Sequence, residues 1–119
     1  MPTRLFQLAF WGAAAFAAVM ALLPLPPDLP VVVGDKVQHM VAFFTLTVLA
    51  AGGYPRVSLI RIGIALSLFG AAIEIAQLVP ALNRTGDVMD WLADMVAVAA
   101  ALVLVGLWRR YSGKRADHT

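Results

Sequence analysis

Four long apolar segments, separated by clusters of proline and glycine, constrain this chain more than any other feature of its sequence. A helix needs about 20 mostly apolar residues to cross a bilayer core of about 30 Å. Because backbone amides find no water partner in lipid, such segments cross as helices. The sequence therefore predicts an all-α polytopic membrane protein, a bundle of four transmembrane helices with spans of roughly 5–23, 37–53, 59–79 and 88–108.

The composition excludes a water-soluble fold of this length. Of the 119 residues, 61% are apolar and only 13% are charged, and the mean hydropathy is +0.84. Soluble domains are about 45–50% apolar and about 25% charged, and a small domain has too much surface to bury so much apolar area from water. The absence of cysteine excludes thiolate chemistry. We expect one transmembrane domain over residues 1–119, in contact with the lipid bilayer and with no nucleic-acid partner.

The positions of Lys and Arg predict the orientation of the bundle. If the four spans alternate in direction, the N-terminus, the connection between spans two and three, and the C-terminal tail share one side. Most of the basic residues lie in these regions, namely Arg4, Arg56, Arg61, Arg109, Arg110, Lys114 and Arg115. The other side has only Lys36 and Arg84. The positive-inside rule then places both termini in the cytoplasm.

Ionisable residues gather at the predicted outer ends of spans two, three and four. In span three, Glu74 and Gln77 share one helical face with small residues, and in span four Asp90 and Asp94 do the same. Small residues let helices approach closely in lipid, so these polar side chains should point into the bundle, toward His39 of span two. An ionisable group inside the membrane is a functional-site hypothesis by default.

This outer cluster supplies the candidate site. The expected ligand-binding residues are Asp35, Lys36, His39, Glu74, Gln77, Arg84, Asp87 and Asp90. The candidate metal ligands are Glu74, Asp87, Asp90 and Asp94, since carboxylate oxygens suit divalent cations. The candidate catalytic residues are His39 and Glu74, as general acid or base. Simpler roles stay open: Asp35 and Asp87 suit helix N-caps, and Gln77 suits a hydrogen bond between helices.

The same residues resemble a known family. The elements Asp35-Lys36-x-x-His39-x-x-x-Phe43, Glu74-x-x-Gln77, and Pro80 followed by Arg84-x-Gly86-Asp87-x-x-Asp90 resemble the VanZ-like family of small bacterial membrane proteins, named after a teicoplanin-resistance accessory protein. The family pattern usually continues with Asn where this chain has Asp94. The resemblance implies a multi-pass protein of the bacterial inner membrane, linked in some members to lower glycopeptide susceptibility.

Three functions compete at this point. The first is an envelope protein whose outer cluster binds a lipid headgroup, a lipid-linked cell-wall precursor or a glycopeptide antibiotic. The second is a membrane enzyme that acts on a phosphorylated lipid, with Mg²⁺ or another divalent cation as cofactor. The third is a small structural or assembly subunit, in which the cluster holds the chain's own helices together. The sequence leaves the oligomeric state open.

Overall fold

Four helices make up the described part of the chain. The computed structural model describes residues 3–22, 34–78 and 88–117, although the side chains of residues 34–36, 90 and 113–117 lie outside this description. The helices are α1 (Thr3–Leu22), α2 (Gly34–Gly53), α3 (Leu59–Ala76) and α4 (Val88–Asp117). No strand occurs within these ranges. The predicted all-α fold is therefore confirmed for the described residues.

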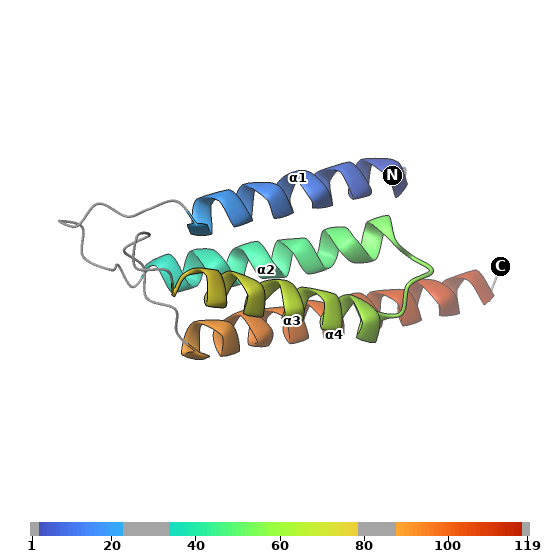
Figure 1. Cartoon of the computed structure of the whole chain (residues 1–119). Helices are drawn as coiled ribbons and strands as arrows, with labels where there is room; N and C mark the ends of the chain where they lie inside the picture. Colours follow the sequence, from blue (N-terminus) through green and yellow to red (C-terminus); the bar gives the residue numbers. More distant parts are fainter. Residues whose placement is uncertain (1–2, 23–33, 79–87, 118–119) are drawn as a thin grey trace.

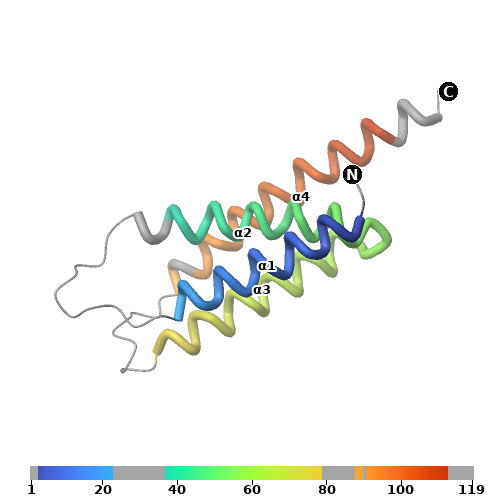
Figure 2. Tube along the Cα trace, turned by 90° about the horizontal axis from the view of Figure 1, so that it is seen from above, coloured from blue at the N-terminus to red at the C-terminus, as the bar shows by residue number. Residues whose placement is uncertain are grey.

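Successive helices run in opposite directions and lie side by side (Figure 1). The view from above shows the same bundle, with both chain ends at one end of it (Figure 2). Helix α2 makes its main contacts with α4 and α1, and α3 packs mainly against α4. This arrangement brings the start of α2, the end of α3 and the start of α4 to the same end of the bundle.

Three helical stretches are long and apolar enough to cross a membrane: Thr3–Leu22, Leu59–Ala76 and Trp91–Ser112. The apolar part of α2, Val37–Gly53, is shorter and covers about 25 Å at 1.5 Å per residue. The predicted second span thus corresponds to a helix at the short limit of membrane-crossing lengths.

The bundle exposes many large apolar side chains, and its core mixes alanines with larger residues such as Leu46, Leu66 and Ile73. Phe16, Leu68 and Val96 are all more than 60% exposed, whereas Ala97 and Ala101 are buried. A water-soluble helical domain would bury the large residues instead, because that burial supplies most of its stability. Extensive exposure of large apolar residues, with small residues such as Ala97 and Ala101 at some helix contacts, is the pattern of helices that pack within lipid.

The helix ends differ from the predicted spans by one to three residues in α1, at the start of α2 and at the end of α3, and by nine residues at the end of α4. Helix α3 ends at Ala76, with Gln77 as its C-cap. A proline ring clashes with the helical carbonyl four residues before it, and for Pro80 that residue is Ala76. Helix α4 continues to Asp117, well beyond the predicted end of the span at residue 108. The extension contains no proline, and its basic residues favour the C-terminal end of a helix dipole.

Polar side chains of α1 and α4 donate hydrogen bonds to backbone carbonyls at the C-terminal end of α2. The last carbonyls of a helix have no partner within it. The Gln7 amide of α1 donates to the Gly53 carbonyl at 2.8 Å, and the Arg109 guanidinium of α4 donates to the Ala51 carbonyl at 3.0 Å. These two bonds fix α1 and α4 against the end of α2 that lies farthest from His39.

Gly53 gives a direct test of this close contact. A Cβ at Gly53 would lie 3.0 Å from the backbone nitrogen of Gln7, whereas a Cβ at Gly12 would meet nothing within 4 Å. We expect Gly53→Ala to lower the stability by about 1–3 kcal/mol, as overpacking does. Gly12→Ala should be neutral or stabilising by up to about 1 kcal/mol, since alanine favours helix more than glycine does. Thermal denaturation in detergent, followed by tryptophan fluorescence, measures both; equal midpoints for the two variants would contradict the contact.

Candidate functional site

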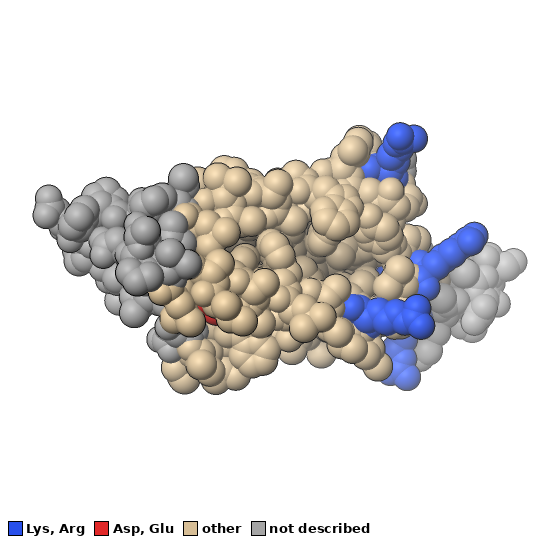
Figure 3. All heavy atoms as spheres, viewed as in Figure 1, with Lys and Arg blue, Asp and Glu red and all other residues tan. Residues whose placement is uncertain are grey.

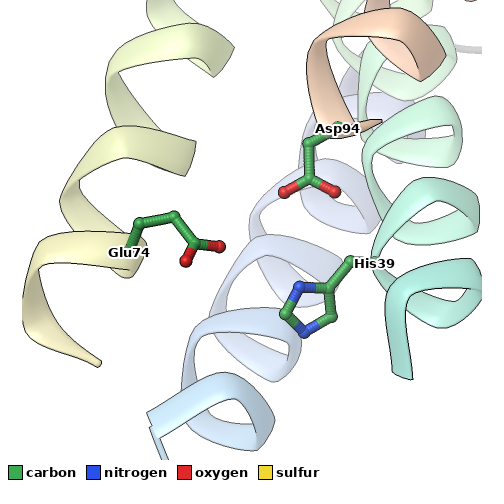
Figure 4. A group of neighbouring side chains, drawn as sticks. All are labelled: His39, Glu74 and Asp94. Carbon is green, nitrogen blue, oxygen red and sulfur yellow. The ribbon is translucent and has the colours of Figure 1, made fainter. Parts of the chain in front are cut away.

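Three ionisable side chains from three different helices meet inside the bundle. His39 comes from α2, Glu74 from α3 and Asp94 from α4, and they point toward one another (Figure 4). One imidazole nitrogen and one oxygen from each carboxylate all lie within 4.8 Å of one another. Residues separated by as many as 55 positions thus form one cluster, which we call the His39–Glu74–Asp94 centre.

The two carboxylates of the centre are almost completely buried. Asp94 is 1% exposed and Glu74 is 8% exposed, while His39 is half-buried. Glu74 Oε1 and Asp94 Oδ1 accept no hydrogen bond within the described residues, although both residues have other interactions. A charged side chain at the middle of a bilayer costs about 2.5–3.5 kcal/mol on insertion scales, so such a pair requires compensation by positive charge or protons.

The centre lies at the end of the bundle opposite the arginines. In Figure 3 the described Lys and Arg side chains cluster at one end, and a small acidic patch shows at the other. His39 lies about 7–8 Å along α2 from its start and Asp94 about 9 Å along α4 from its start, at 1.5 Å per residue. The centre is therefore one to two turns inside this end, and no described Lys or Arg side chain lies beside it.

Hydrogen bonds from neighbouring residues hold the helices around the centre. The Gln77 amide, one turn after Glu74, donates to the Ala21 carbonyl of α1 at 2.8 Å and is itself buried. The Trp91 indole, one turn before Asp94, donates to the Ser67 carbonyl of α3 at 3.1 Å. These bonds fix α3 against α1 and α4, and so set where Glu74 and Asp94 lie.

A packed layer closes the side of the centre that faces the middle of the bundle. Phe43, one turn after His39, is buried, and its ring lies 5.9 Å from that of Phe69. A Cβ added at Gly70 would lie 3.3 Å from the Phe43 ring and 3.4 Å from the Trp91 indole. Further along α2, Thr47 is fully buried, and its hydroxyl donates to the Phe43 carbonyl of its own helix. The polar cluster therefore does not continue along the bundle through this layer.

The structure places the predicted site residues in three groups. His39, Glu74 and Asp94 form the centre, and Gln77 lies beside it with its amide bonded to α1. Asp35, Lys36 and Asp90 belong to α2 and α4, but their side chains are not among those described. Arg84 and Asp87 lie outside the described residues. The structure therefore describes the side chains of four predicted site residues, namely His39, Glu74, Gln77 and Asp94.

The structure places His39, one of the predicted ligand-binding residues, beside the two carboxylates. One feature of the site did not follow from the sequence: the Trp91 indole donates to the Ser67 carbonyl of α3 and so helps to position Asp94. The spacing of Trp91 three residues before Asp94 was the available signal, because residues at i and i+3 share one helix face.

An imidazole and two carboxylates can share protons, bind a cation, or combine a cation with an anionic ligand. These three possibilities follow from the positions of the His39, Glu74 and Asp94 side chains alone. Comparisons with protein-family models, with curated proteins and with solved structures found no match to this chain.

Proposed function

We propose that this chain is a VanZ-like, multi-pass protein of the bacterial inner membrane, and that its His39–Glu74–Asp94 centre binds the polar headgroup of an envelope ligand. The ligand is a phospholipid or a lipid-linked cell-wall precursor, which share a phosphate group beside the lipid chain. The observation that carries this proposal is the meeting of three ionisable side chains from three helices near one end of an apolar bundle. Ionisable groups inside the membrane are rare and costly, and they mark substrate and ion pathways.

Four crossings with both termini in the cytoplasm fit this proposal. The described arginines cluster at the end where both chain termini lie, and the positive-inside rule then places that end in the cytoplasm. The centre consequently belongs to the extracytoplasmic half, where headgroups of the outer leaflet and lipid-linked precursors are within reach. The three longer apolar stretches support membrane insertion, and the shorter α2 is held between α1 and α4.

The proposal predicts a loss of ligand and of protection when the centre is neutralised. The double variant Glu74→Gln/Asp94→Asn should retain normal protein levels but carry several-fold less phosphate-bearing lipid through purification than the parent. If the intact protein lowers teicoplanin susceptibility, the variant should restore it. Quantitative mass spectrometry of lipids bound to protein in detergent distinguishes a phospholipid from a lipid-linked precursor.

A matched substitution at the opposite end serves as control. Gln7→Ala removes a bond between helices of the same kind as the Gln77 bond, but far from the centre. It should leave lipid content and susceptibility at the parent level. Normal amounts of the double variant with unchanged lipid content and unchanged susceptibility would refute headgroup binding. If teicoplanin itself binds to the purified parent, the ligand of the centre is the antibiotic and not a lipid.

A second candidate, a metal-assisted enzyme that acts on a phosphorylated lipid, is favoured by one observation. The centre presents an imidazole beside two carboxylates, and such a set can hold a metal that polarises a phosphate oxygen. Release of phosphate from a lipid substrate by the purified protein, lost in Glu74→Gln, would support it. The third candidate, a structural subunit, draws on the bonds of Gln77, Trp91 and Arg109, which join helices without involving the centre.

A further inference from the structure

We propose that His39, Glu74 and Asp94 together bind one divalent cation of the zinc or manganese type, and that this cation provides the contact to the phosphate of the headgroup. The second clause rests on the proposed function, whereas the cation site itself stands on the geometry of the centre. Each of three helices supplies one ligand, so the site exists only when α2, α3 and α4 are assembled.

The distances suit a metal after a small adjustment. Metal–nitrogen and metal–oxygen bonds of about 2.0–2.2 Å give ligand-to-ligand distances of about 3.4 Å in a tetrahedral site. The candidate ligand atoms already lie within 4.8 Å of one another. The remaining difference of at most about 1.4 Å is small enough for side-chain rotation to close.

The charges also favour a divalent cation. Two ionised carboxylates and a neutral imidazole carry a net charge of −2, which one divalent cation neutralises. Neutralisation matters more here than at a surface, because Asp94 and Glu74 are almost completely buried and ion pairs are stronger at low dielectric. A monovalent cation would leave an uncompensated charge among the helices. An anionic phosphate would meet repulsion from the carboxylates unless a cation lay between them.

The ligand types indicate which cation. Imidazole suits zinc, copper, iron and nickel, while magnesium and calcium prefer sites made entirely of oxygen. One imidazole with two carboxylates therefore favours Zn²⁺, or Mn²⁺ through the carboxylates, over Mg²⁺. The sequence alone leaves the cation open as Mg²⁺ or another divalent cation. Three protein ligands leave at least one position open, as in catalytic zinc sites. Since Phe43, Gly70 and Trp91 close the inner side, a phosphate oxygen would reach that position from the outer end of the bundle.

The experiment measures binding of the metal alone to the full chain in detergent and in phosphatidylcholine vesicles. Equilibrium dialysis against Zn²⁺, Mn²⁺ or Mg²⁺, followed by elemental analysis, should give about one Zn²⁺ or Mn²⁺ per chain and weaker binding of Mg²⁺. His39→Ala, Glu74→Gln and Asp94→Asn should each weaken binding by about 100-fold or more, since loss of even an outer-shell partner costs 10–100-fold. Gln7→Ala, which removes a helix contact at the opposite end of the bundle and no ligand, should stay within about 10-fold of the parent.

The outcomes separate the cation site from the proposed function. No metal bound by the parent in either environment overturns the cation site, even if lipid content still depends on Glu74 and Asp94. Metal bound equally by the parent and all three ligand variants also overturns it. Metal bound as expected while lipid content stays unchanged in the variants confirms the cation site and rejects headgroup binding. Phosphate-dependent tightening of metal binding, tested with inorganic phosphate and with phosphatidic acid vesicles, distinguishes a free phosphate from a lipid headgroup.

Discussion

Asp94→Asn is expected to lower the denaturation temperature relative to the parent when divalent metal is present. When metal is removed, the same substitution is expected to leave that temperature unchanged or to raise it. With a chelator present, the parent holds two buried carboxylates close together, and the variant, which removes one of them, should denature at the same temperature or higher. With Zn²⁺ at about 100 times its Kd, the parent gains about 2.7 kcal/mol from binding. That gain corresponds to roughly 10 °C in a domain of about this size, and the variant should not share it.

The measurement is a thermal denaturation series in detergent, with and without metal, for the parent, Asp94→Asn and Gln7→Ala. Gln7→Ala removes the bond to the Gly53 carbonyl far from the centre, so it should lower the midpoint in both conditions by a similar amount. A purely structural network predicts a different result, in which Asp94→Asn lowers the midpoint equally with and without metal. That pattern would exclude the cation site and favour the third candidate function, a structural subunit.

Ala101→Leu is expected to be the most disruptive single substitution away from the centre. Ala101 is completely buried, whereas its neighbour Ala100 is exposed on the outside of the same helix. Adding a bulky side chain to a packed contact costs about 1–3 kcal/mol or more, and the displaced α4 would carry Asp94 away from His39. Ala101→Leu should therefore lower both the denaturation midpoint and metal affinity, and Ala100→Leu should change neither.

Thermal denaturation and metal dialysis on this matched pair separate packing from hydrophobicity, because both variants add the same side chain. Equal behaviour of the two variants would show that α4 does not pack through Ala101. A loss of stability in Ala101→Leu with unchanged metal affinity would show that the packing of α4 does not position Asp94.

The helices and the buried face of each were predictable from the sequence, since hydropathy marks membrane segments and the small residues at helical spacing mark their contacts. Glu74 and Asp94 were predicted to point into the bundle because they share faces with Gly70 and Ala97, and the structure buries both. Local rules sufficed for these features, because one helix face is determined by the order of residues along that helix alone.

The membership of the centre was not predictable in the same way. Helical spacing gives the face of a residue, but not which residue of another helix lies opposite, because that depends on the relative shift of two helices along their axes. The sequence therefore could not show that Asp94 lies beside Glu74 and His39. The family pattern even drew attention away from Asp94, which stands where Asn is usual. The helix shift is determined by contacts such as Trp91 to Ser67 and Gln77 to Ala21, which only the assembled bundle contains.

The central claim, that His39, Glu74 and Asp94 meet in one place, can be measured without any ligand. The chain contains no cysteine, so each pair of centre residues can be replaced by cysteines and treated in native membranes with a short thiol-reactive cross-linker. The intact mass then distinguishes one linker that bridges both thiols from two linkers that are each attached at one end. The control pair, Arg61→Cys with Glu74→Cys, lies about 20 Å apart along α3 and should carry no bridging linker. The account predicts a single bridging linker in all three centre pairs; its absence from these pairs, as in the control, would contradict it.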